Sequence, residues 1–254
     1  MKIVLIGSGN VATHLGKAFQ NCGHEIVQVY SRLDTNAKGL GKVLKCEHTN
    51  DINKINKKAD VYFIALKDDV IEGFVNKIKF PGKVIIHTSA SLPMNILNKS
   101  SKDFGVFYPL QSFTKDRVID LKEITIFIES NNIRSKKVLL ELAKCISDKV
   151  SEITFEQRLT LHVAAVFANN FTNHLYKIAG DILKTSGLSF DVLKPLIKET
   201  ADRVMITDPA LVQTGPAQRK DHKTIAKHLE LLKNFHAYHN IYSVFSQSIE
   251  RQSK

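Results

Sequence analysis

Cysteine is scarce in this chain, and its few positions exclude several classes of protein. Cys22, Cys46 and Cys145 are odd in number and form no C-x-x-C pair. A secreted disulfide framework and a cysteine-based zinc site both need paired or clustered cysteines. The pattern therefore predicts a reducing compartment, and we expect a cytoplasmic protein.

The chain also lacks a segment suited to secretion or to a membrane. Its N-terminal apolar run ends at Gly7, which is too short for the apolar region of a signal peptide. Residues 159–176 contain no Asp, Glu, Lys or Arg, but histidine and asparagine side chains interrupt them. Such polar groups are costly in lipid. We expect a helix buried in protein and no membrane span.

The charge of the chain is strongly basic, yet the basic residues form no pattern typical of nucleic-acid binding. The formal net charge is +11, and most of the 36 basic residues are scattered lysines. No arginine-rich or aromatic-interleaved stripe occurs, which argues against a nucleic-acid partner. Histidines 222, 228, 236 and 239 meet no Asp, Glu or Cys pattern, so no metal site is predicted. A basic surface instead attracts small phosphorylated or carboxylate ligands.

The most informative motif lies in the first dozen residues. An apolar strand over residues 2–6 runs into a G-x-G-x-x-A sequence, and a helical pattern follows at once. The first glycine permits a sharp turn, the second lets a pyrophosphate approach the backbone, and the alanine allows close helix packing. The helix N-terminus would offer free N–H groups to the phosphates. The predicted cofactor contacts are Gly7, Ser8, Gly9, Asn10 and Val11; the alternative is an ordinary tight turn with chance glycines.

The end of the second strand indicates which dinucleotide binds. Residues 24–30 form this strand, and Ser31 and Arg32 follow it where NAD-binding proteins usually carry an acid. A hydroxyl and a guanidinium suit a 2′-phosphate, which Arg grips with two charge-assisted hydrogen bonds. Asp34 lies beyond the strand tip and is a less suitable ribose ligand. We therefore predict NADP, although Arg32 could also be a solvated loop residue.

Two halves of different composition follow one another along the chain. Up to about residue 128, apolar strands alternate with helices, as βαβ units do. After about residue 152 no strand pattern occurs, and helices are expected over 155–180, 191–207 and 224–252. We predict an α/β fold, an N-terminal Rossmann parallel sheet with a C-terminal all-helical domain. Residues 1–151 would bind NADP, and residues 152–254 would serve substrate binding and dimerisation. The other expected strands are 60–66, 83–87, 105–108 and 124–129, with a helix from 133 to about 148.

Several motifs together resemble a family that joins a Rossmann-like domain to a C-terminal helical domain of unknown function. They are GSGNVATHL (7–15), Ser31-Arg32, ADVYFIALKDDVI (59–71), HTSAS (87–91), YPLQSF (108–113), AAVFANNF (164–171) and TGPAQRKD (214–221). Members are labelled NADP oxidoreductases, and the family is distantly similar to pyrroline-5-carboxylate reductases and hydroxyacid dehydrogenases. The resemblance implies a helical half of the 6-phosphogluconate dehydrogenase C-terminal type.

The resemblance also implies residues beside the nicotinamide. In such relatives the loops after the strands that end at Leu66 and His87 border the nicotinamide ring. By position, the resemblance implicates Ala65, Leu66, Lys67, His87 and Ser89. His87 could equally be a strand-end histidine satisfied by backbone. One departure concerns catalysis, because hydroxyacid dehydrogenases of this type carry a lysine four residues before a helical asparagine. Here Ala165 and Val166 occupy those positions.

A polar stripe marks the long helix that begins near residue 155. At about 100° per residue, His162 and Asn169 share one face of the helix, and Asn170 lies at the edge of that face. Buried polar groups need partners. Those partners are either substrate and nicotinamide, with His162 as proton donor, or other helices and a second subunit.

These observations predict an NADP(H)-dependent oxidoreductase that reduces a C=O or C=N bond of a small polar substrate. The site would lie in the cleft between the two halves, with His162, Asn169 and Asn170 as catalytic residues. A homodimer is expected, because the uncharged helix and the apolar stripe after residue 224 need further cover. The missing lysine leaves one alternative, a non-catalytic NADP-binding sensor or interaction protein.

Overall fold

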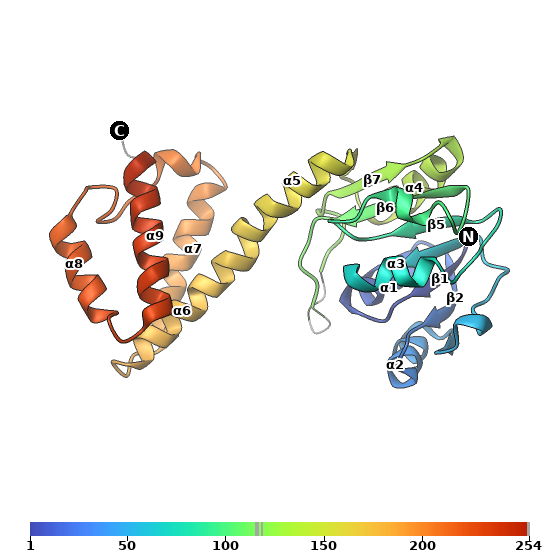
Figure 1. Ribbon diagram of the computed structural model, residues 1–254, viewed down its shortest axis with the longest axis horizontal. Helices are drawn as coiled ribbons and strands as arrows, with labels where there is room; N and C mark the ends of the chain where they lie inside the picture. Colours follow the sequence, from blue (N-terminus) through green and yellow to red (C-terminus); the bar gives the residue numbers. More distant parts are fainter. Residues whose placement is uncertain (115–116, 118, 253–254) are drawn as a thin grey trace. The chain divides into compact units, whose positions relative to one another are not determined.

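The computed structural model describes residues 1–114, 117 and 119–252, and it divides the chain into two compact units, Met1–Asn169 and Asn170–Lys254. The first unit contains all the strands of the described residues, and the second is helical (Figure 1). Helix α5, Phe155–Ala165, belongs to the first unit. The predicted assignment of residues 1–151 and 152–254 to separate functions stays a prediction.

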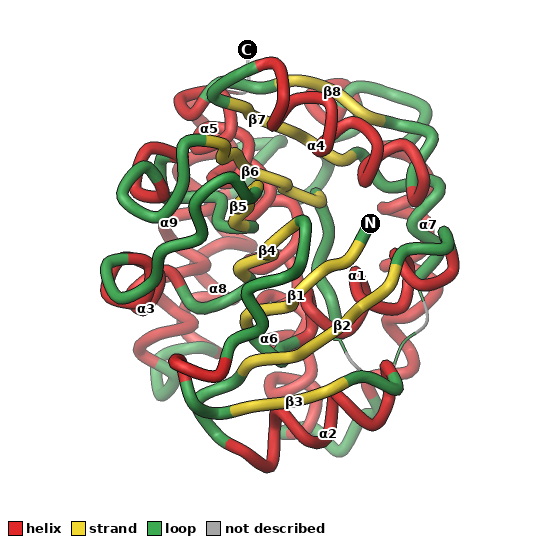
Figure 2. Tube along the Cα trace, turned by 90° about the vertical axis from the view of Figure 1, so that its right-hand side faces the viewer, coloured by secondary structure: helices red, strands yellow, loops and turns green. Residues whose placement is uncertain are grey.

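An eight-stranded sheet of order β3-β2-β1-β4-β5-β6-β7-β8 organises the described part of the first unit. Figure 2 shows the strands in this succession. The order matches that of doubly wound dinucleotide-binding sheets. Every pairing is parallel except that of β6 with β7, so the predicted α/β class is confirmed with one antiparallel pair. The strands are β1 Lys2–Ile6, β2 Glu25–Tyr30, β3 Glu47–Thr49, β4 Val61–Ile64, β5 Val84–His87, β6 Asp103–Pro109, β7 Ile126–Ser130 and β8 Val150–Glu152.

The inner strands are apolar on both faces because helices cover both sides of the sheet. In β1, Ile3 and Leu5 face one core, and Val4 and Ile6 face the other. Side chains of α1, α2 and α4 contribute to the first core, and α3 with two short 3₁₀ segments covers the second. The sheet edge at the strand carboxyl ends is thereby left for ligands. The covering elements are α1 Asn10–Asn21, α2 Asp34–Leu44, α3 Asp68–Val75, α4 Ile133–Ile146, and 3₁₀ turns Ile52–Lys54 and Met94–Leu97.

The predicted long helix over residues 155–180 is helical throughout but changes its winding. A π-helical stretch, Val166–Phe171, separates α5 from α6, Thr172–Lys184. π-helical turns are rare and occur often at functional sites. This one contains Asn169 and Asn170, so the spacing of an ideal α-helix does not hold across the polar stripe.

The predicted helix over 224–252 is wrong as a single element. The chain forms α8, His222–Leu231, and α9, His236–Gln252, with a turn between them. The apolar periodicity of the sequence continues across this turn, and the pattern therefore hides the break. Asp221 caps α8 by accepting a hydrogen bond from the Thr224 N–H at 3.1 Å. The predicted helix over 191–207 corresponds to α7, Lys194–Val204, after a 3₁₀ turn, and a further 3₁₀ turn spans Pro209–Leu211.

The second unit buries few of its own side chains. Within Asn170–Gln252, all of which the structure describes, only Ile178, Ala217, Leu232 and Ser246 are buried. No helix among the described residues has the length and apolar character needed to cross a membrane.

Candidate cofactor and active site

The turn between β1 and α1 can be made only with glycine at its first position. Gly7 has φ of +118°, and a Cβ atom there would lie 2.2 Å from the Ala65 carbonyl oxygen. Its N–H donates to the Tyr30 carbonyl at 2.8 Å, which ties the turn to the end of β2. Gly9 differs, because a Cβ atom there would meet nothing within 4 Å. The backbone thus leaves open space at the second glycine, where a phosphate could approach.

The N-terminus of α1 is suited to hold an anion. Within residues 1–114, which are described throughout, Gly9 provides no side-chain cap and the first turn of α1 carries no acid. The first N–H groups of this helix therefore have no side-chain acceptor, and the helix dipole favours negative charge there. Ala12 is buried, as close packing against the strand requires.

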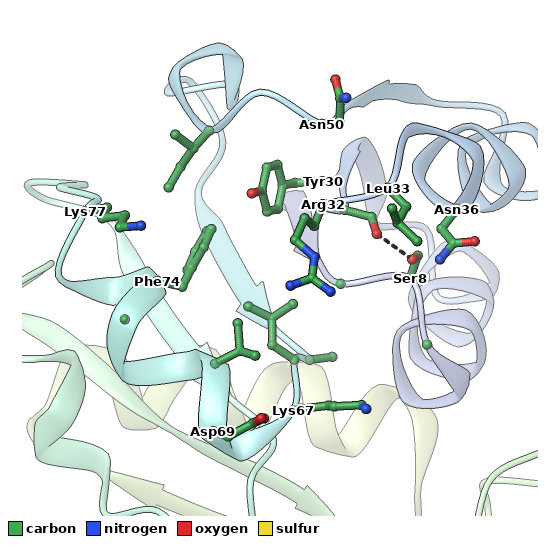
Figure 3. Close-up of a pocket in the computed structure, with 18 of the residues that line it drawn as sticks. Ser8, Tyr30, Arg32, Leu33, Asn36, Asn50, Lys67, Asp69, Phe74 and Lys77 are labelled. Carbon is green, nitrogen blue, oxygen red and sulfur yellow. Dashed lines mark hydrogen bonds between the residues drawn. The ribbon is translucent and has the colours of Figure 1, made fainter.

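The tip of β2 lies beside this turn. The Ser8 hydroxyl donates to the Ser31 hydroxyl oxygen at 2.9 Å, so the glycine turn and the strand tip are joined. In Figure 3 the Arg32 side chain lies in the middle of a cavity, with Ser8 and Asn36 on one side and Phe74 on the other. Two hydroxyls, an amide and a guanidinium therefore gather where a 2′-phosphate would be recognised.

This cavity has a volume of about 930 Å³, which lies in the range of small-molecule and cofactor sites. Its aromatic wall includes Tyr30 and Phe74, whose ring centroids are 5.3 Å apart. Three cationic and two acidic side chains line it, so its charge favours an anionic ligand. The lining residues are Gly7, Ser8, Gly9, Tyr30, Ser31, Arg32, Leu33, Asn36, Asn50, Asp51, Ile52, Ala65, Leu66, Lys67, Asp69, Val70, Gly73, Phe74 and Lys77.

Most of the predicted cofactor residues meet at this cavity. Asn10, Val11, His87 and Ser89 do not line it, although the first two lie in the opening turn of α1. The Asn10 side chain donates to the Phe113 carbonyl at 2.6 Å, so only its backbone faces the anion position. Those that line it are Gly7, Ser8, Gly9, Ser31, Arg32, Ala65, Leu66 and Lys67.

The loop after β5 is held by a buried arginine that the sequence patterns did not reveal. Arg158 in α5 is fully buried and donates to the carbonyls of Ser89, Ala90 and Leu92 at 2.5–2.9 Å. It also pairs with the Glu129 carboxylate at 3.0 Å. The first turns of α5 are thereby fixed to the loop beyond His87. The sequence signal for Arg158 is the capping box of Thr154 and Gln157, because it places Arg158 in the first turns of a helix.

His87 is buried at the end of β5 and carries no charge at neutral pH. Its Nδ1 atom accepts a hydrogen bond from the Ser89 N–H at 3.1 Å. Burial, followed by the positive charge of Arg158, lowers the pKa of His87 to about 3. The Ser89 hydroxyl accepts from the N–H groups of Ser91 and Leu92, both at 3.1 Å. Both predicted residues therefore shape the loop after β5.

Two members of the polar stripe find partners at the carboxyl end of β6. His162 Nδ1 lies 3.2 Å from the Tyr108 hydroxyl, and the Asn169 amide donates to the Ser112 hydroxyl at 2.7 Å. Both partners belong to the YPLQSF segment. This segment also reaches α1, since the Asn10 amide donates to the Phe113 carbonyl at 2.6 Å. Asn169 and Asn170 are exposed. His162 and Asn169 thus lie on the sheet edge that also carries the glycine turn, and Tyr108 joins them as a residue not predicted from the sequence.

No group of three or more His, Cys, Asp or Glu side chains that could hold a metal ion occurs among the residues with described positions.

The fold and the cavity define a dinucleotide-binding protein of the Rossmann class. Comparisons with known proteins agree with this class. Residues 2–91 match the family model described as NADP oxidoreductase, coenzyme F420-dependent, and residues 124–249 match a domain of unknown function, DUF2520. The crystal structure of a putative NADP oxidoreductase from Bacteroides fragilis is 41% identical, with a TM-score of 0.91 and 98% of each chain covered. A comparison with curated proteins gives no match.

Two further solved structures share the fold at low identity. The pyrroline-5-carboxylate reductase of Streptococcus pyogenes is 14% identical, with a TM-score of 0.64, and 100% of this chain and 98% of that chain are covered. A reductive aminase from Aspergillus terreus, in complex with NADPH and ethyl levulinate, is 14% identical with a TM-score of 0.72, covering 98% and 92%. At this identity the two likenesses show the fold alone.

The chain belongs to the NADP oxidoreductase family that the Bacteroides fragilis protein represents. It is an oxidoreductase with NADP as its cofactor, and the predicted resemblance is confirmed. The family also favours an enzyme over the non-catalytic alternative.

Proposed function

We propose that this enzyme is an NADPH-dependent reductase of a C=O or C=N bond in a small polar substrate. The observation that carries the proposal is the position of His162 and Asn169, which contact Tyr108 and Ser112 at the carboxyl end of β6. In parallel sheets of this order, ligands bind outside the carboxyl ends of the strands. The names of the reductive aminase and the pyrroline-5-carboxylate reductase add support, since both denote reductions at carbon bonded to nitrogen.

The cofactor residues divide by the part of NADP that each would hold. The backbone of Gly7 to Val11 would bind the pyrophosphate at the start of α1. Ser31 and Arg32 would bind the 2′-phosphate, and Asn36 lies beside them in the same cavity. Ala65, Leu66 and Lys67 would border the nicotinamide, with the loop of His87 and Ser89 next to them. When bound, the reduced cofactor supplies a hydride.

The substrate side is formed by the polar stripe. His162 would give a proton to the substrate oxygen or nitrogen, and Asn169 and Asn170 would orient that atom by hydrogen bonds. Both asparagines lie within the π-helical stretch, so their amides are placed differently relative to His162 than in an ideal α-helix. The predicted location in a cleft between the two halves stays a prediction.

The test is NADPH consumption over a panel of small ketones and cyclic imines, with the variants His162→Gln and Asn170→Ala. Turnover is expected to fall by about 10²–10⁴-fold for His162→Gln, the usual contribution of a positioned proton donor. Melting temperature and NADPH affinity should stay close to those of the native protein. A lowered melting temperature with turnover falling only in proportion to folded protein would make the stripe structural and contradict the proposal.

We also propose that the enzyme is a homodimer whose helical units cover one another. Four buried residues in Asn170–Gln252 are too few for a self-sufficient helical unit. Large apolar side chains are correspondingly exposed, and an apolar cavity of about 380 Å³ lies between α6 and α9. A second copy of the chain would bury these exposed side chains and cover the apolar cavity. The exposed residues include Leu188, Val192, Leu196, Val204, Met205, Ile206, Leu211, Leu231, Val244 and Phe245.

A further inference from the structure

The Tyr108 side chain is buried at the carboxyl end of β6, although it carries a hydroxyl group. Its exposed fraction is 9%, and it packs with Ala90 and Val106. Buried hydroxyls are nearly always hydrogen-bonded. Within the described part of the chain, the partner of this hydroxyl is Nδ1 of His162, at 3.2 Å. The two rings meet edge to face, with centroids 6.3 Å apart.

Donation by Tyr108 is the direction of this hydrogen bond that pairs the buried phenol proton. If Tyr108 donates, its hydroxyl proton lies on the path to Nδ1, and the neutral imidazole then carries its own proton on Nε2. If Nδ1 donates instead, the phenol proton has no acceptor among the described residues. Burial raises the pKa of Tyr108 above its ordinary value, so the phenol keeps its proton at neutral pH.

We propose that Tyr108 is a positioning residue that fixes the Nε2–H tautomer of His162 and replaces the proton that His162 donates. The proposal rests on the proposed function, in which His162 is the proton donor. Tyr108 does not touch the substrate and acts through the imidazole ring.

The proton transfer balances without any further reactant. The Nε2–H bond breaks as a bond forms between that proton and the substrate oxygen or nitrogen. At the same time the Tyr108 O–H bond breaks and an Nδ1–H bond forms, so the imidazole stays neutral and a phenolate remains. After the product leaves, Nε2 takes a proton from a water molecule while the Nδ1 proton returns to the phenolate, and hydroxide is released to the solvent.

Arg158 provides the charge that such a phenolate needs. It lies one helical turn before His162 and is fully buried. Its positive charge acts on Tyr108 in the direction that favours the phenolate, against the effect of burial. Glu129 pairs with Arg158 at 3.0 Å, and His87 beside them is neutral. Glu129 therefore compensates part of the Arg158 charge. The effect of Arg158 on Tyr108 is still that of a positive charge.

The experiment is ¹⁵N NMR of the histidine rings in the full-length protein, with His162 assigned by comparison with His162→Gln. At mildly alkaline pH, the native ring is expected to hold its proton on Nε2, with the Nδ1 signal shifted as that of a hydrogen-bond acceptor. In Tyr108→Phe the Nδ1 shift should move toward that of a ring without this bond, and a measurable fraction of Nδ1–H should appear. A native ring protonated on Nδ1 overturns the proposal, whatever the variant does.

The matched control is Tyr62→Phe. Tyr62 is a second buried tyrosine of the same sheet, and its hydroxyl donates to the Asn56 carbonyl at 2.7 Å. This variant loses a comparable hydrogen bond, yet the His162 signals should not change. Equal changes in both variants would overturn the proposal, because they would show a general effect on the sheet.

Turnover separates this proposal from the function on which it rests. Tyr108→Phe is expected to lower kcat by at least about 10-fold, within the contribution of a positioned proton donor, and to leave the KM and the NADPH affinity within about two-fold. Unchanged kcat in a variant whose tautomer has shifted overturns the proton-supply role. The NMR result needs no substrate, so a failure of the proposed function would not be mistaken for a failure of the pair.

Discussion

At the scale of single residues, the buried histidine of β5 makes stability depend on pH. His87 has a pKa of about 3 in the folded protein and an ordinary value near 6.5 when the chain is unfolded. Between these two values the unfolded chain binds a proton that the folded protein does not. The free energy of unfolding therefore falls as the pH is lowered from about 6.5 to about 3, by up to a few kcal/mol.

This dependence can be measured by denaturant unfolding across the acidic range. His87→Gln cannot take up the proton in either state, so its stability should fall less steeply over the same interval. A variant whose stability falls as steeply as that of the native protein would show that His87 does not titrate as its burial implies.

The residues that sequence reasoning identified are those whose chemistry is local in the chain. Gly7, Gly9 and Arg32 follow from a turn and a strand tip, which are read from neighbouring positions. Tyr108 and Arg158 could not be found in this way, because their partners lie 54 and 66–69 residues away along the chain. A fully buried arginine in particular contradicts the ordinary expectation that charged residues lie on the surface.

At the scale of elements, α5 is anchored to the sheet by Arg158, and this anchor should dominate the stability of the contact. Arg158→Met leaves the Glu129 carboxylate without its partner and three carbonyls without donors. Removal of one member of a buried ion pair typically costs about 3–5 kcal/mol, and we expect a loss of that size by denaturant unfolding.

Lys149→Met is the appropriate control for this prediction. Lys149 pairs with Glu123 at 2.8 Å, but both side chains are more than half exposed. Its loss should change the free energy of unfolding by less than about 1 kcal/mol. Similar values for the two variants would contradict the anchoring role of Arg158.

The elements that could be predicted are those with strong periodicity. Inner strands such as β4 and β5 are continuous apolar runs, which helices on both faces require. The edge strands β3 and β8 were missed because each has three residues with mostly polar, exposed side chains. The π-helical stretch was missed because Val166–Phe171 contains no Gly or Pro and the segments on both sides of it are helical, so no local sequence signal marks the change of winding. The break between α8 and α9 was hidden because both helices share the apolar pattern.

At the scale of the whole molecule, the exposed apolar side chains of the second unit predict a homodimer. Light scattering at micromolar concentration should give twice the chain mass of 28.6 kDa. Leu196→Glu and Ile206→Glu place charge on strongly exposed apolar positions of the second unit and are expected to weaken association.

Ile133→Glu provides the matching control, since Ile133 is 88% exposed but lies in α4 of the first unit. This variant should remain dimeric. A monomeric mass for the native protein at micromolar concentration would refute the dimer.

We expect the first unit to bind NADP through Ser31 and Arg32 beside the glycine turn. The most direct test is a fluorescence titration of the native protein and Arg32→Ala with NADPH and NADH. The native protein is expected to bind NADPH more tightly, and Arg32→Ala should weaken NADPH selectively. Loss of a charge-assisted contact worth about 1.5–3 kcal/mol corresponds to about 10- to 150-fold in the dissociation constant.

Arg134→Ala controls for the loss of one positive charge, because Arg134 pairs with Asp103 at the start of β6, away from the strand carboxyl ends. It should leave both affinities unchanged. We expect a clear preference for NADPH in the native protein and its loss in Arg32→Ala. Equal dissociation constants for the two cofactors in the native protein would contradict it.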